Sequence, residues 1–174
     1  MQHDFYEVDL LDSKGNIIGH KPRNQIDKLA DIFHTAHVLM ITAQGEVILS
    51  IIPLREDLPN VYAEKLGTTV ATIRRSGETA EQAAKRSVSR ELFIEEMPLT
   101  LMGEGFFKVP PMKDNYLTAY YGISDPPESY SLLDIDGLVV MPPKEIDAMI
   151  ESDPDSLAAS FIEIWKAYKE KLPI

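Results

Sequence analysis

The sequence of 174 residues contains no cysteine. This absence excludes disulfide bonds, thiolate nucleophiles and zinc sites built on cysteine. Long apolar runs are also missing, because the longest ones, at residues 37–41 and 47–54, fall well short of the roughly 20 residues that a membrane-spanning helix needs. The first residues are acidic and lack the apolar segment of a secretory signal. We therefore expect a cytoplasmic protein with no membrane partner.

Basic residues are scarce: 17 Lys and Arg stand against 28 Asp and Glu, which gives a formal net charge of −11. Binding of nucleic acid without sequence preference needs a basic surface that displaces counterions, so we expect no nucleic-acid partner. An acidic protein that acts on an anionic substrate needs a divalent cation or a local basic patch.

Apolar residues make up 44% of the chain, which is enough for the core of one domain spanning residues 1–174. Helical patterns occur before and after the strand-like runs, which predicts a mixed sheet covered on both faces, an α/β (α+β) fold. We expect strands at residues 5–11, 16–20, 36–42, 46–52, 66–75, 99–109, 116–123 and 135–141. We expect helices at residues 24–33, from 79 to before Pro98, at 142–152 and at 156–171.

The segment from Gly77 to Ile94 is the most informative part of the sequence. Thr79 and Gln82 form a capping-box pattern, so a helix should begin at Thr79. Successive residues of a helix are separated by about 100°. On that spacing one buried stripe contains Ala80, Ala84, Val88 and Leu92.

Glu91 falls inside this apolar stripe, with Ser87 beside it. A carboxylate that faces a core is costly unless it is paired or bound to a metal. Two interpretations of Glu91 follow: a metal ligand, or a buried carboxylate paired with an arginine.

The same segment resembles the Nudix box of the Nudix hydrolases. That pattern is a Gly, five residues, a Glu, seven residues, then Arg-Glu-aliphatic-any-Glu-Glu-any-Gly-aliphatic. Glu78 stands at the first Glu, Arg86 at the Arg and Glu91 at the last Glu of the pair. Four positions depart from the pattern, and they are Thr72, Ser87, Arg90 and Phe93. Flanking segments are similar to the branch that includes isopentenyl-diphosphate isomerase, whose catalytic cysteine this chain lacks.

The resemblance implies a Nudix-type α/β/α sandwich and a divalent-metal-dependent hydrolase that cleaves a small-molecule diphosphate. It makes Glu91, Glu78 and Arg86 the catalytic residues, with Glu91 and Glu78 as ligands of Mg²⁺ or Mn²⁺. Arg74 and Arg75 are expected to meet substrate phosphates, since Arg offers paired donors. Because two carboxylates of the pattern are missing, a degenerate Nudix-fold binding or regulatory module is the alternative. The sequence leaves open whether the protein forms a homodimer.

Each of these residues also has a structural interpretation. Glu78 suits the N-terminus of a helix through the helix dipole, and Arg86 suits a solvated helix face. Arg74 and Arg75 suit the end of a strand. Structural roles are preferred for the two histidines at 34 and 37, and a solvated loop position is preferred for Asp134 over a general base.

Overall fold

The computed structural model of the protein describes residues 5–56 and 60–174, and it contains a seven-stranded mixed sheet and a separate two-stranded hairpin. The central strand β3 (His34–Ile41) pairs in parallel with β8 (Asn115–Ile123). The remaining strands of the large sheet are β4 (Val47–Ile51), β5 (Leu66–Gly67), β6 (Val70–Ile73), β7 (Thr100–Phe107) and β9 (Gly137–Met141).

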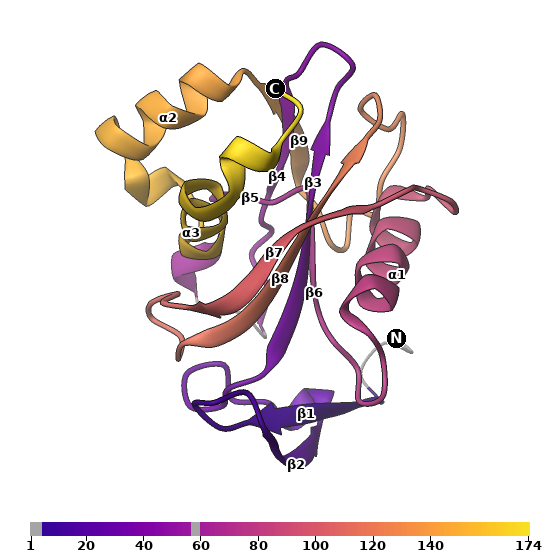
Figure 1. Cartoon of the computed structure of the whole chain (residues 1–174), viewed down its shortest axis with the longest axis vertical. Coiled ribbons are helices and arrows are strands. Elements are labelled where there is room, and N and C mark those ends of the chain that lie inside the picture. The colour runs from indigo at the N-terminus through magenta and orange to yellow at the C-terminus, as the bar shows by residue number, and fades with distance from the viewer. Residues whose placement is uncertain (1–4, 57–59) are drawn as a thin grey trace.

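Helices cover both faces of the large sheet (Figure 1). Helix α1 (Ala80–Leu92) packs on one face, and α2 (Pro143–Ser152) and α3 (Ala159–Tyr168) lie on the other. Alternate residues of β3 divide between the two cores: Val38 and Met40 pack with α1, whereas Leu39 and Ile41 pack with α3. The predicted α/β/α sandwich with a mixed sheet is therefore confirmed.

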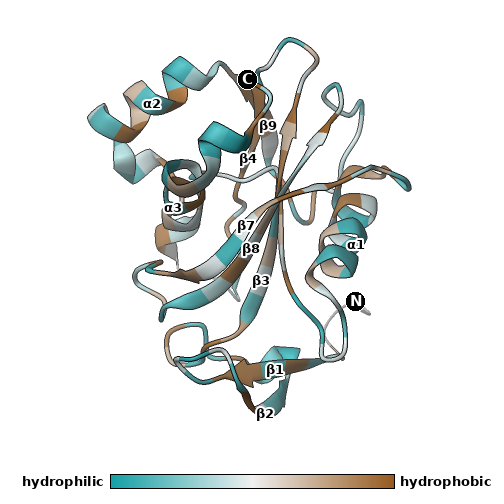
Figure 2. Cartoon of the chain, viewed as in Figure 1, coloured by the Kyte–Doolittle hydropathy of each residue, from teal (hydrophilic) through white to brown (hydrophobic). Residues whose placement is uncertain are grey.

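The outer sides of the helices are polar. Figure 2 shows hydrophilic (teal) stretches on α1 and α2. None of the helices in the described ranges is long and apolar enough to span a bilayer.

The sheet forks at one edge of β3. Since β8 pairs with β3 over its whole length, β4 and β6 must share the opposite edge. β4 pairs there with Met40 and Ile41, and β6 pairs with residues Thr35 to Val38. At the fork, the hydroxyl of Thr69 bonds to the carbonyl oxygen of Ile48 and accepts from the backbone N–H of Met40. The expected strand at residues 66–75 is thus divided into β5 and β6.

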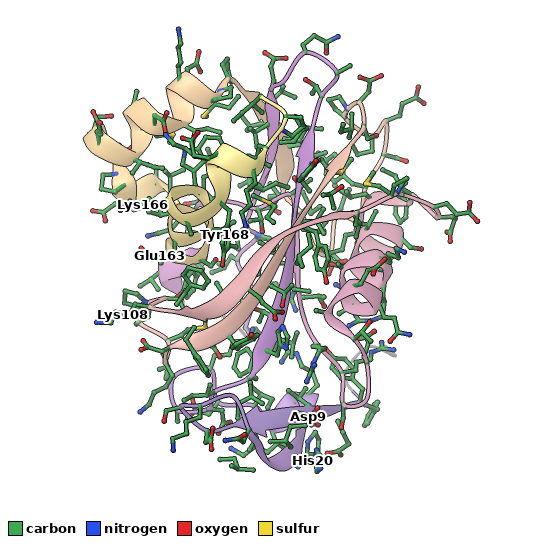
Figure 3. All side chains as sticks on the ribbon, viewed as in Figure 1. Asp9, His20, Lys108, Glu163, Lys166 and Tyr168 are labelled. Carbon is green, nitrogen blue, oxygen red and sulfur yellow. The ribbon has the colours of Figure 1, made fainter. Side chains whose placement is uncertain are left out.

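The hairpin of β1 (Glu7–Leu11) and β2 (Ile17–Pro22) holds the turn that precedes α1. Buried Asp9 accepts hydrogen bonds from Ser76 at 2.5 Å and from His20 at 2.8 Å, and its other oxygen lies 3.4 Å from the guanidinium of Arg74. Figure 3 shows Asp9 and His20 together at this end of the molecule. The contact links the amino-terminal hairpin to the residues between β6 and α1.

Two helix predictions need correction. Residues 24–33 form no α-helix, and the 3₁₀ turn Arg23–Gln25 only overlaps their start. The carboxylates of Asp27 and Asp31 accept from backbone N–H groups of this segment and compete with a helix. The helix expected at 156–171 is limited to α3, with 3₁₀ turns Pro154–Ser156 and Lys169–Lys171 on either side. Phe161, Ile164 and Trp165 of α3 are buried.

We expect Thr79→Ala to lower the free energy of unfolding by about 1 kcal/mol, because the Thr79 hydroxyl caps the Gln82 N–H at 3.1 Å. Thr79→Ser keeps the oxygen and should lose much less. Urea denaturation of both variants measures the difference. Equal losses in the two variants would show that the cap contributes nothing.

Candidate functional site

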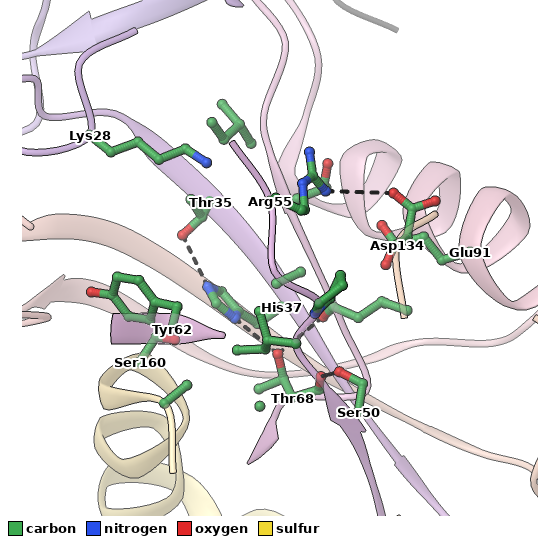
Figure 4. Close-up of a pocket in the computed structure, with 18 of the residues that line it drawn as sticks. Lys28, Thr35, His37, Ser50, Arg55, Tyr62, Thr68, Glu91, Asp134 and Ser160 are labelled. Carbon is green, nitrogen blue, oxygen red and sulfur yellow. Dashed lines mark hydrogen bonds and ion pairs between the residues drawn. The ribbon is translucent and has the colours of Figure 1, made fainter. Parts of the chain in front are cut away.

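A cleft of about 550 Å³ opens at the fork of the sheet. Its wall combines β3, the β4 and β5 ends, β6, the end of α1 and the loop before β9, together with Tyr6 and Arg23 from the amino-terminal region. This volume suits a small organic ligand and exceeds the need of a lone inorganic ion. Figure 4 shows the side chains of Lys28, His37 and Arg55 around the cleft.

Glu91 faces this cleft from α1 and is 4% exposed. Its Oε1 accepts a hydrogen bond from Ser87 Oγ at 2.6 Å and another from the guanidinium of Arg90 at 2.5 Å. The inward direction predicted from the helical spacing is confirmed. The pairing with an arginine, one of the two interpretations of this residue, is what the structure shows.

Arg90 joins Glu91 to a second carboxylate. Its Nη2 lies 3.5 Å from Asp134 Oδ1, and Arg55 approaches the same oxygen at 3.8 Å. The loop before β9 is held at this place because the N–H of Ser131 donates to the carbonyl oxygen of Glu91 at 2.7 Å. Asp134, for which a solvated loop position was preferred, is therefore part of an ion cluster in the cleft wall.

Burial raises the pKa of Glu91 to about 7, although Arg90 and Ser87 act in the opposite direction. The nearby charge of Asp134 adds to the rise. Near neutral pH this carboxyl group is therefore divided between its protonated and ionised forms.

Glu78 and Arg86 form a separate pair outside the cleft lining. Arg86 donates from Nε to Oε1 of Glu78 at 2.8 Å and from Nη2 to Oε2 at 2.9 Å, and Oε2 also accepts from the N–H of Arg75. Burial opposes ionisation of Glu78, but these hydrogen bonds outweigh it and lower the pKa. Arg86 further reaches the carbonyl oxygen of Ile73 at 3.2 Å. It is a bound cation that joins the strand to the helix, so the solvated alternative is wrong.

The residues predicted to hold Mg²⁺ or Mn²⁺ do not fit such an ion as they are arranged. The guanidinium group of Arg90 forms an ion pair with Glu91, and both oxygens of Glu78 accept hydrogen bonds from Arg86. Within the described ranges, no three His, Cys, Asp or Glu side chains come together as a metal site. Mg²⁺ is normally held by oxygen ligands, and two guanidinium partners repel it. The metal and catalytic roles of Glu91, Glu78 and Arg86 stay predictions.

Arg74 and Arg75 face the amino-terminal hairpin and the residue before it. Arg74 contacts Asp9, and the guanidinium of Arg75 lies 4.7 Å from the centroid of the Tyr6 ring. Neither arginine is among the residues that line the cleft. Their contact with substrate phosphates stays a prediction.

Several residues of the cleft were not predicted as site residues, notably Arg23, Lys28, Arg55 and Tyr62. Lys28 lies in the segment expected to be a helix, and the other three lie outside the expected strands and helices, so no spacing pointed to them. His37 was assigned a structural role, and it lines the cleft between two threonines. His34 is buried against Thr118 at 2.6 Å, consistent with the structural role preferred for it.

The protonation of Glu91 predicts a pH-dependent stability. Because its folded pKa lies above the usual 4.5, ionisation of Glu91 destabilises the folded state as the pH rises from about 4.5 to about 7. Relative to Glu91→Gln, the wild type should lose up to about 3 kcal/mol between pH 4.5 and 8, since one pKa unit corresponds to about 1.4 kcal/mol. Urea denaturation of both proteins across this pH range measures the difference in their free energies of unfolding. A difference that stays constant with pH would contradict the prediction.

Several solved structures similar to this chain carry the Nudix or MutT name. The protein DR0079 from Deinococcus radiodurans, described as a hypothetical Nudix protein, superposes with a TM-score of 0.74 at 19% identity and covers 93% of this chain and 99% of its own. The MutT protein from Methanosarcina mazei has a TM-score of 0.64 at 15% identity, with coverages of 84% and 98%.

A third similar structure is the Nudix domain of NrtR from Shewanella oneidensis in complex with ADP ribose. Its TM-score is 0.51 at 10% identity, over 87% of this chain and 92% of that one. No family model and no curated protein matches the sequence. The likeness is thus one of backbone architecture. The protein therefore has the Nudix fold.

Proposed function

We propose that the cleft binds an organic diphosphate directly through its own cationic side chains, and that the chain acts as a Nudix-fold binding module. The observation that carries this proposal is the charge of the cleft. Among the described residues, four basic side chains and two acidic ones line it. The basic side chains are Arg23, Lys28, Arg55 and Arg90.

This local excess of positive charge contrasts with the net charge of −11 of the chain. A concave site lined by one sign of charge raises the local concentration of ligands with the opposite sign. The excess grows further when Glu91 is protonated, as its pKa of about 7 allows near neutral pH. An anionic ligand is therefore the charge class that this cleft favours.

Arg90 explains why no metal ion is needed for this function. It stands where the Nudix pattern has the first glutamate of the pair, and its guanidinium bridges Glu91 and Asp134. Arginine binds phosphate oxygens through paired N–H donors, so one substitution changes both the charge and the chemistry of the wall.

The ADP-ribose complex of the NrtR Nudix domain supports the choice of ligand, because ADP ribose is an organic diphosphate bound by this fold. The volume of about 550 Å³ is consistent with a ligand of this kind that occupies the cleft in part or in full.

Hydrolysis of the diphosphate is the second candidate, and the position of Glu91 favours it. A carboxyl group with a pKa of about 7 that faces a ligand cleft has the properties of a general acid or base. Mg²⁺ or Mn²⁺ dependence follows from the resemblance alone, and it requires Arg90 to leave Glu91.

Direct binding predicts that ADP ribose and inorganic diphosphate bind to the purified protein in the presence of a chelator. Arg55→Gln should weaken both by roughly tenfold, because one charge-assisted contact to phosphate is lost. The matched control is Lys85→Gln, which removes the same charge from the exposed outer side of α1, where Lys85 pairs with Glu81. Isothermal titration calorimetry measures all three proteins. Binding that appears only with added Mg²⁺ or Mn²⁺, or equal losses in both variants, would refute direct binding.

The two candidates differ in turnover. With Mg²⁺ or Mn²⁺ and a panel of organic diphosphates, a binding module releases no phosphate, whereas a hydrolase releases phosphate and loses most of this activity in Glu91→Gln. We expect no turnover. A phosphate-release assay on both proteins decides, and metal-dependent turnover that Glu91→Gln abolishes would establish the second candidate in place of the first.

A further inference from the structure

His37 lies in the wall of the cleft between two hydroxyl groups. Its Nε2 is 3.1 Å from Thr35 Oγ1 and its Nδ1 is 3.1 Å from Thr68 Oγ1 (Figure 4). The Thr68 hydroxyl also donates to the carbonyl oxygen of Val70 at 3.2 Å. A hydroxyl has a single proton, so Thr68 accepts the bond from His37. The proton of the imidazole therefore resides on Nδ1.

This arrangement leaves Nε2 as an acceptor. Burial, followed by the nearby ring of His34, lowers the pKa of His37 to about 4, so the imidazole is uncharged near neutral pH. Nε2 then carries a lone pair, and the hydroxyl of Thr35 donates to it. A further hydrogen bond holds this wall in place, from Ser50 Oγ to the carbonyl oxygen of Thr68 at 2.8 Å.

The cleft therefore has two chemically different regions. The cationic side chains Lys28 and Arg55 offer only donors and positive charge. In the His37–Thr35 pair, the lone pair of Nε2 accepts from a rotatable hydroxyl, which a ligand donor can replace. An ammonium group suits neither region, because the lining is already rich in cations. A ligand that uses both regions carries an anionic group and an uncharged hydrogen-bonding group.

A hydroxyl group fits the His37–Thr35 pair better than an N–H group. A ligand hydroxyl inserted between the two donates to Nε2 of His37 and accepts from the hydroxyl of Thr35, so every polar atom keeps a partner. An N–H group donates to Nε2 but accepts nothing, and it leaves the proton of the partly buried Thr35 without its acceptor, which is costly beside the buried ring of His37.

We propose that His37, with Thr35, is a specificity-determining residue of the cleft, and that it selects organic phosphates that carry a hydroxyl group. The inference rests on the proposed function, since it concerns the same cleft. It adds a role for a histidine that the Nudix pattern does not include.

The test compares ADP ribose with inorganic diphosphate, which has the phosphates without the hydroxyls, by isothermal titration calorimetry in chelator. His37→Phe removes both ring nitrogens and keeps a planar side chain, and Thr35→Val removes the hydroxyl at nearly constant shape. We expect each variant to bind ADP ribose roughly tenfold more weakly and inorganic diphosphate with unchanged affinity. Unchanged diphosphate binding also shows that the variant cleft is folded.

A second readout concerns the imidazole itself. Nitrogen-15 NMR of the wild type should show the Nδ1–H form of His37, and ADP ribose should shift Nε2 whereas inorganic diphosphate should not. Equal weakening of both ligands in both variants would reduce His37 to a structural role and overturn the inference. Wild-type binding of diphosphate without tighter binding of ADP ribose would overturn the inference alone. Failure of both ligands to bind the wild type would overturn the proposed function and the inference with it.

Discussion

The ion cluster at the end of α1 is the interaction on which the rest of the site depends. Glu91 is turned into the protein, where an isolated carboxylate is strongly unfavourable. Arg90 and Ser87 hydrogen-bond its Oε1, and the remaining cost appears as a raised pKa. The same guanidinium reaches Asp134, so one arginine connects the helix to the loop before β9 and forms a wall of the cleft.

The position of this cluster follows from the topology of the sheet. β4 and β6 compete for one edge of β3, and the gap between them is a cleft rather than a continuous sheet. Segments far apart in the chain meet there: Lys28 before β3, Arg55 after β4 and Asp134 before β9. A chain that is strongly acidic as a whole thus places more basic than acidic side chains among the described residues that line this cleft.

Local patterns were sufficient to predict most of the fold. The capping box of Thr79 and Gln82, the buried stripe of α1 and the inward direction of Glu91 all depend on residues within a few positions of one another. The cap and the inward Glu91 are confirmed, and so is the stripe, except that Ala80 is only partly buried. The strands expected at residues 36–42 and 46–52 are also confirmed, as the antiparallel neighbours β3 and β4. Local patterns failed at residues 24–33, where the side chains of Asp27 and Asp31 bind the backbone in a way that helix propensity does not describe.

The site was predictable only in part, because local patterns do not show which distant segments meet. The sequence by itself determined that an acid faces inward at position 91 and that neither disulfides nor thiolate chemistry are available. It also showed a resemblance to the Nudix pattern, with departures at four positions, two of which lose a carboxylate. Only the tertiary structure decided what neutralises that acid, that Arg86 holds Glu78, and that His37 lines a cleft with Lys28 and Arg55. Helical spacing sets the direction of a side chain, whereas the charge and the partner that meet it come from segments brought close by the pairing of distant strands.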